Sequence, residues 1–270
     1  MIDKNASLDD TIKHINEIYE QSNSERDFRD IIVLFFEDIG RCFQLIMRKR
    51  QDEVEGMLPS MFKWFCALYA RFEGRASLAS EILWKKFPGI CPYCVKNRCE
   101  CGVGKEVLNV KKIFEIADTQ KNSKPKTLNE WQDHFQKIYP RGAESSFEIN
   151  VSHLAEELAE LSEAYRKAYV RKDIPCVDME LADVFSWIMG LSNLINQLKQ
   201  SNRDRKEYHI GDVIYENYKE GCPKCALLRS KTKLEKCCCS VSAKKLRLIS
   251  DYDESEAASI EISNSIGLQP

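Results

Sequence analysis

The sequences LAEELAELSEAYRKAYV, residues 154–170, and VDMELADVFSWIMGLSNL, residues 177–194, decide how this chain folds. In the first, apolar residues recur every three or four positions, as at Leu154, Leu158 and Leu161. This spacing predicts a helix with one core-facing stripe. The second stretch has the same spacing, so the chain is expected to fold into packed helices.

Both predicted helices carry acidic residues beside the apolar stripe. Glu157 and Glu160 lie three residues apart on the first helix. At this spacing two side chains project from the same side of a helical turn. Glu180 and Asp183 have the same spacing on the second helix. The connector at 173–175 is short enough to make the helices antiparallel, which brings the pairs face to face.

Four facing carboxylates are costly to bury without a compensating charge. Because all the ligand atoms are oxygens, with no His or Cys, the set favours Mg²⁺ or Mn²⁺ over Zn²⁺. The alternative is a solvated acidic face, which is the ordinary fate of a Glu-rich helix.

With Glu156, these acids form an EExxE motif followed by ExxD, and here the chain resembles the MazG-like, all-α nucleoside triphosphate pyrophosphohydrolases. The resemblance covers residues 127–218. It implies hydrolysis of an NTP or dNTP to the NMP or dNMP and pyrophosphate by water activated on Mg²⁺. The implied catalytic residues are Glu156, Glu157, Glu160, Glu180 and Asp183, of which the last four would bind Mg²⁺. Glu156 or an uncoordinated acid would be the general base.

Residues expected to contact the substrate are less sharply defined. The candidates for the phosphates are Lys167, Arg171 and Lys172, and Asn217 matches a polar position in the last helix of the family. Trp131 could stack on the base, although a core position explains it equally well.

The chain also matches itself. Residues 7–19, 35–41, 57–64 and 84–94 align with residues 127–139, 154–160, 180–187 and 215–225. Two tandem copies of one unit explain all four matches. Where the second copy has its four acids, the first has Asp38, Arg41, Met57 and Ser60. The first copy is therefore predicted not to bind the catalytic metal.

Active sites of the resembling family are completed by neighbouring subunits of a helical oligomer. The resemblance thus implies either a homo-oligomer or an intrachain pseudo-dimer, in which the inactive copy supplies the neighbour.

A cysteine cluster closes each copy. The first contains Cys91, Cys94, Cys99 and Cys101, and the second contains Cys222, Cys225, Cys237 and Cys239, with Cys238 able to replace either neighbour. The polar, acidic N-terminus and the absence of a long apolar run predict a cytoplasmic protein with no membrane partner. In that reducing setting two structural Cys₄ zinc knuckles are expected. A redox pair in each C-x-x-C is the alternative, but no βαβ pattern lies nearby.

The expected architecture is all-α, with two MazG-like helical-bundle repeats each closed by a zinc knuckle. We assign the degenerate repeat to residues 1–102, a linker to 103–126, the active repeat to 127–239 and a tail to 240–270. The competing hypothesis is a noncatalytic, zinc-stabilised protein that senses nucleotides or binds nucleic acid. Basic residues flank both Cys clusters, but a solvated basic loop explains them without nucleic acid.

Overall fold

The computed structural model describes residues 2–71, 78–101, 108–140, 146–171, 174–201 and 207–225. Regular structure in these ranges is helical, which confirms the all-α class. The α-helices are α1 (Leu8–Ser24), α2 (Phe28–Met47), α3 (Leu58–Ala70), α4 (Ala79–Lys86), α5 (Val110–Thr119), α6 (Leu128–Ile138), α7 (Phe147–Arg171), α8 (Ile174–Ser201) and α9 (Ile210–Tyr218). The 3₁₀ helices are η1 (Gln51–Met57) and η2 (Lys121–Ser123).

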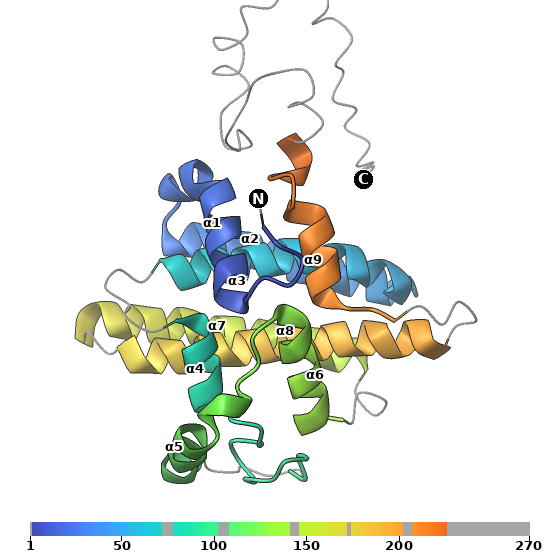
Figure 1. Ribbon diagram of the computed structural model, residues 1–270. Coiled ribbons are helices and arrows are strands. Elements are labelled where there is room, and N and C mark those ends of the chain that lie inside the picture. The colour runs from blue at the N-terminus through green and yellow to red at the C-terminus, as the bar shows by residue number, and fades with distance from the viewer. Residues whose placement is uncertain are drawn as a thin grey trace, which may run out of the picture.

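Helices α7 and α8 form the antiparallel hairpin that the sequence predicts. They cross the molecule side by side, and α2 packs against α7 (Figure 1). Residues 172–173 connect them, and Pro175 lies in the first turn of α8, where its missing N–H has no cost. Viewed as in Figure 1, α1 and α9 lie above this layer and α4, α5 and α6 lie below it.

Helices that match in the sequence alignment make matching contacts. Helix α1 packs on α3 as α6 packs on α8, and α2 packs on α3 as α7 packs on α8. Helices α1 to α4 form the first half of the chain, and α6 to α9 form the second. The last helix of each half packs on the other half, since α4 contacts α8 and α9 contacts α3. The two halves of the chain are therefore interlocked.

Two histidines at aligned positions make equivalent bonds between the halves. The ring Nε2 of His14 lies 3.1 Å from the backbone oxygen of Tyr218, and that of His134 lies 2.8 Å from the backbone oxygen of Phe87. Tyr218 and Phe87 are themselves aligned. Burial lowers the pKa of His134, so its ring is neutral and donates from Nε2 at neutral pH. Both histidines thus have structural positions.

The starts of α1 and α6 are paired as well. Ser7 caps α1 by accepting from the Asp10 N–H at 3.1 Å, and Thr127 caps α6 in a capping box with Glu130. The two cap residues form an antiparallel bridge. This bridge fixes the position of the first helix of one half relative to that of the other.

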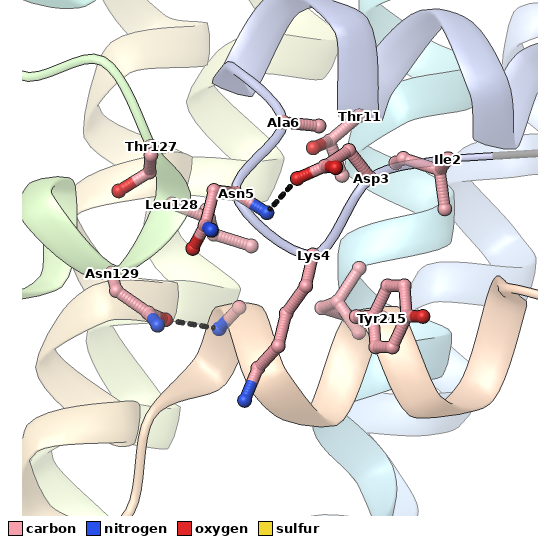
Figure 2. Close-up of a pocket in the computed structure, with 12 residues that line it drawn as sticks. Ile2, Asp3, Lys4, Asn5, Ala6, Thr11, Thr127, Leu128, Asn129 and Tyr215 are labelled. Carbon is pink, nitrogen blue, oxygen red and sulfur yellow. Dashed lines mark hydrogen bonds between the residues drawn. The ribbon is translucent and has the colours of Figure 1, made fainter.

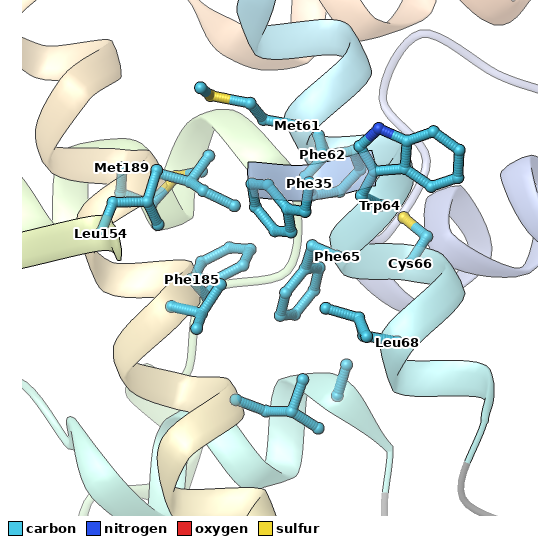
Figure 3. Packing of buried hydrophobic residues seen from close by; sticks show 14 of the residues in the cluster. Phe35, Met61, Phe62, Trp64, Phe65, Cys66, Leu68, Leu154, Phe185 and Met189 are labelled. Atoms are coloured by element: carbon cyan, nitrogen blue, oxygen red, sulfur yellow. The ribbon is translucent and has the colours of Figure 1, made fainter. Parts of the chain in front are cut away.

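The core is continuous across the halves. Phe62 and Phe65 of α3 meet Phe185 of α8, with ring centroids 6.5 and 5.2 Å apart. Figure 3 shows these rings with Met189 and Leu154 to their left in that view. Aromatic pairs at these separations add to the stabilisation from burial alone, so α3 and α8 hold the halves together.

The segment before α1 crosses the start of α9 (Figure 2). Asn129 Oδ1 accepts from the Gly211 N–H at 2.7 Å, and a Cβ at Gly211 would lie only 2.4 Å from that oxygen. Lys4 pairs with Asp212 at 3.3 Å. The cavity between these groups holds about 30 Å³, room for little more than one water molecule. These contacts therefore connect the N-terminal segment to α6 and α9, and the cavity is too small for a substrate.

The predicted linker, 103–126, contains α5, whose Ile113 and Ala117 are buried. Helix α5 packs on α4, and Trp84 Nε1 donates to the Ala117 backbone oxygen at 2.9 Å. The described helices include none with the length and apolar character needed to cross a bilayer. The predicted tail, 240–270, lies outside the described residues.

Candidate functional site

Three of the four acids predicted to bind a metal ion meet between α7 and α8. Glu157, Glu180 and Asp183 each place one carboxylate oxygen within 4.8 Å of the others. Trp187 Nε1 donates to Glu157 Oε1 at 3.2 Å and holds that side chain in place. The antiparallel hairpin thus brings together the acids that the i, i+3 spacing aligns on each helix.

The electrostatics of this group oppose full ionisation. Burial, with the neighbouring Asp183 charge, raises the pKa of Glu157 to about 7. The same two causes raise the pKa of Glu180 to about 6. Burial also raises the pKa of Asp183, against the opposing effect of Lys86. Because the carboxylates repel one another in partly dry surroundings, a bound cation would lower their free energy.

The other two predicted acids lie outside this group. Glu160 is exposed and lies three residues after Glu157 on the same side of α7, and its charge helps to raise the pKa of all three grouped carboxyls. Glu156 is also exposed and its Oε2 lies 2.7 Å from His153 Nδ1. Glu156 therefore faces solvent beside His153, and the metal-binding geometry centres on three acids.

Lys86 reaches the acids from the other half of the chain. Its side chain is almost fully buried, and Nζ donates to Asp183 Oδ2 and, at 3.1 Å, to the Met179 backbone oxygen. One ammonium offsets one of three carboxylates, so the group still favours a further cation. Sequence reasoning missed this residue. The available signal was its alignment with Asn217, a position already considered for substrate binding.

A cavity of about 370 Å³ adjoins the carboxylates. Aromatic rings and Leu194 form most of its walls, and three thiols of the first cysteine cluster and several polar side chains complete them. The lining residues are Phe87, Cys91, Tyr93, Cys99, Cys101, Phe135, Tyr139, Trp187, Leu194, Asn150, Glu157, Asp183, Ser186, Gly190 and Asn193. Mostly apolar walls with a few amide and hydroxyl groups suit a flat heteroaromatic ligand. Glu157 and Asp183 belong both to the acid group and to the lining of this cavity.

Gly190 brings α8 close to one of those amides. A Cβ at position 190 would lie 2.8 Å from Asn150 Oδ1. A side chain there would move the Asn150 amide, so the glycine preserves the shape of this wall.

The first cysteine cluster is assembled as predicted. Cys91, Cys94, Cys99 and Cys101 place their sulfur atoms within 4.8 Å of one another and could hold a metal ion such as zinc. Burial raises the pKa of Cys91 to about 11. Burial also acts to raise the pKa of Cys94, but hydrogen bonds from the backbone of Glu100 and Lys96 and from the thiols of Cys91 and Cys101 together lower it. Bound Zn²⁺ would keep all four as thiolates.

This cluster is also part of the cavity. The Cys99 N–H donates to the Ile138 backbone oxygen at 2.7 Å, which anchors the cluster on α6 of the other half. Tyr93, between two of the cysteines, lines the cavity, and burial together with the Asp183 and Glu157 charges raises the pKa of its hydroxyl. The cluster from one half thus walls a cavity beside the acids of the other.

The second cluster is described only in part. Cys222 and Cys225 are buried, and Tyr19 Oη donates to Cys222 Sγ at 3.4 Å. Cys237, Cys238 and Cys239 lie outside the described residues. The second knuckle therefore stays a prediction.

The residues predicted to contact substrate are not gathered at the acids. Trp131 is fully buried in the core and does not line the cavity. Lys167 is exposed and pairs with Glu163 at 2.7 Å. Asn217 lines a different cavity, formed with α3, and its Nδ2 donates to the Val213 backbone oxygen. The side chain of Arg171 and the whole of Lys172 lie outside the described part of the chain.

Comparison of the chain with family models, with curated proteins and with solved structures gives no match. The functional assignment therefore depends on the geometry of the site and on the motif resemblance.

Proposed function

We propose that the chain is a Mg²⁺-dependent nucleotide pyrophosphohydrolase of the MazG-like kind, which converts an NTP or dNTP to the NMP or dNMP and pyrophosphate. The observation that carries this proposal is the group formed by Glu157, Glu180 and Asp183 beside the 370 Å³ cavity. Oxygen-only ligands suit Mg²⁺, and the cavity has the size and lining for a nucleobase.

The catalytic unit in this proposal is an intrachain pseudo-dimer of two tandem repeats. The matching helix contacts and the reciprocal bonds of His14 and His134 support it. The first repeat would contribute Lys86 and the cysteine wall to the site, and the second would contribute the acids. One chain would then hold one complete site.

Bound Mg²⁺ would neutralise the triphosphate oxygens and lower the pKa of a water molecule. Glu157, Glu180 and Asp183 would hold it, and Trp187 would keep Glu157 in position. In the proposed reaction the water oxygen would form a bond to the α-phosphorus while the bond from that phosphorus to the bridging oxygen breaks, and pyrophosphate would leave with the bridging oxygen. Glu160, near the group but outside it, would accept the water proton.

The proposal is tested by measuring pyrophosphate release from a panel of NTPs and dNTPs with Mg²⁺. We expect release by the wild type and a loss of at least about 100-fold in Glu180→Gln, since a metal ligand is removed without a change in shape. The matched control is Glu148→Gln, an exposed acid on the first turn of α7, which should retain full activity. If the wild type releases pyrophosphate from no nucleotide, the proposed catalysis is refuted. If Glu180→Gln releases it as fast as the wild type and Glu148→Gln, the acid group is not the catalytic site.

Lys86 favours a second candidate, a noncatalytic nucleotide sensor. A lysine that already pairs with Asp183 supplies part of the charge that a metal ion would bring. In that case nucleotide would bind without turnover, with Lys86 contacting a phosphate. Nucleotide binding with no pyrophosphate released in the same panel would select this candidate.

A further inference from the structure

A second large cavity is lined mainly by residues of the first half of the chain. It holds about 340 Å³ between α1, α3 and α9. Its lining includes Tyr19, Trp64 and Tyr218, which align with Tyr139, Trp187 and Phe87 of the cavity beside the acids. The two cavities therefore occupy equivalent places in the two halves.

The charges of the second cavity are reversed. Ser60 and Lys63 line it at the positions where the other cavity has Asp183 and Ser186. Its nearby acid, Asp38, is 2 % exposed and has its hydrogen bonds satisfied. Donors to Asp38 are Ser60 Oγ at 2.5 Å, Trp64 Nε1 at 2.9 Å and Arg41 Nη1 at 3.1 Å. A single saturated carboxylate does not make a metal site.

Three cationic side chains line this cavity instead. They are Arg26, Lys63 and Lys224. Lys63 Nζ lies 3.7 Å from the centre of the Trp64 ring and 5.4 Å from that of Tyr19. Within the described residues Lys63 makes no ion pair. Burial, with the charges of Lys224 and Arg26, lowers the pKa of Lys63 to about 8, against the opposing effect of Asp38.

Cations that lie together in a cavity, with no acid paired to them, attract anions because an anion would relieve their mutual repulsion. Phosphate groups suit such a setting, because Arg binds them through paired hydrogen bonds and Lys binds them as a point charge. The aromatic rings of Tyr19 and Trp64 beside the cations would also accept a planar ring. No divalent cation is needed to screen a phosphate here.

We infer that the cavity lined by Arg26, Lys63 and Lys224 binds a phosphate-bearing anion, either a nucleotide or free pyrophosphate, without a divalent metal. It is a second site, separate from the acids, and its existence does not depend on the proposed hydrolysis. Helix α3, which carries Lys63, packs on α8, which carries Asp183.

The experiment is isothermal titration of the full chain in EDTA with inorganic pyrophosphate and with adenosine 5′-monophosphate. EDTA removes the metal that the acidic site would need for phosphate. We expect binding that weakens with added salt, weakens about tenfold in Lys63→Gln and in Lys224→Gln, and persists in Lys63→Arg. The control is Lys13→Gln, an exposed lysine of α1.

Tighter binding of the monophosphate would identify a nucleotide as the ligand, and equal or tighter binding of pyrophosphate would identify the phosphate groups alone. Failure of both probes to bind the wild type would overturn the inference. Wild-type affinity in both Lys63→Gln and Lys224→Gln would also overturn it, and the second variant decides if the first does not fold. Loss of binding in Glu180→Gln would show that the anion binds in the cavity beside the acids, and not in the cavity lined by Arg26, Lys63 and Lys224.

Discussion

Replacing Lys86 by Met should destabilise the metal-free chain by an amount that depends on pH. The substitution keeps most of the apolar stem but leaves Asp183 buried without its ammonium partner. Breaking a buried ion pair from one side costs about 3 kcal/mol. For a chain of this size that corresponds to a fall in melting temperature of roughly 6–12 °C.

The pH dependence follows from the Asp183 carboxyl. Its pKa is already raised by burial and is held down by Lys86, so removing the lysine raises it further. At pH 8 the variant must bury an unpaired carboxylate or take up a proton, whereas near pH 5 the carboxyl is more readily protonated. The destabilisation should therefore be larger at pH 8 than at pH 5.

The assay is thermal unfolding in EDTA at both pH values, compared with Lys85→Met, an exposed neighbour on α4. Excess Mg²⁺ at pH 8 should recover much of the lost stability, because the ion supplies the missing positive charge. If Lys86→Met and Lys85→Met melt alike, or if the loss is the same at both pH values, then the reasoning about this ion pair is refuted.

Two further predictions concern the metal sites. The pKa values of Glu157, about 7, and Glu180, about 6, lie above the usual 4.5, so the folded chain holds more protons than the unfolded one between pH 4.5 and 7. Metal-free stability should thus fall by roughly 1–2 kcal/mol as pH rises through this window, after discounting for partial exposure. Mg²⁺ affinity, measured by calorimetry, should rise over the same window because the ligands lose their protons. Stability that rises with pH, or Mg²⁺ affinity that falls with pH, would contradict the direction of these pKa shifts. Cys94→Ser should contain one zinc ion per chain fewer than Cys42→Ser, as measured by elemental analysis. Cys42 is a buried cysteine outside the cluster and serves as the control. Equal zinc content in the two variants would exclude the first cysteine cluster as a zinc site.

The helices and the acid cluster could be predicted because short-range patterns determine them. The 3.6-residue periodicity of 154–170 and 177–194 marks the buried stripes, and the short connector makes an antiparallel hairpin the natural outcome. The cysteine cluster follows in the same way, since Cys91 to Cys101 spans one short loop.

The exchange of helices between the halves could not be predicted from local patterns. Asn217 was expected beside the acids, but α9 packs on α3, and Lys86 of α4 occupies the matching place beside Asp183. The alignment of the two copies shows that Lys86 and Asn217 are equivalent positions. Only the packing of distant helices determines which of the two lies beside the acids. Trp131 illustrates a second gap, because a tryptophan near a motif has the same pattern whether it faces a ligand or the core.

The most direct test of the account is Mn²⁺ binding, followed by electron paramagnetic resonance, in the wild type and in Glu180→Gln. We expect that the wild type binds Mn²⁺, that Mg²⁺ displaces it, and that Glu180→Gln binds it at least about tenfold more weakly because one oxygen ligand is lost. A wild type that binds no Mn²⁺ at pH 8, or a variant that binds it as well as the wild type, would contradict the claim that these acids hold a divalent cation.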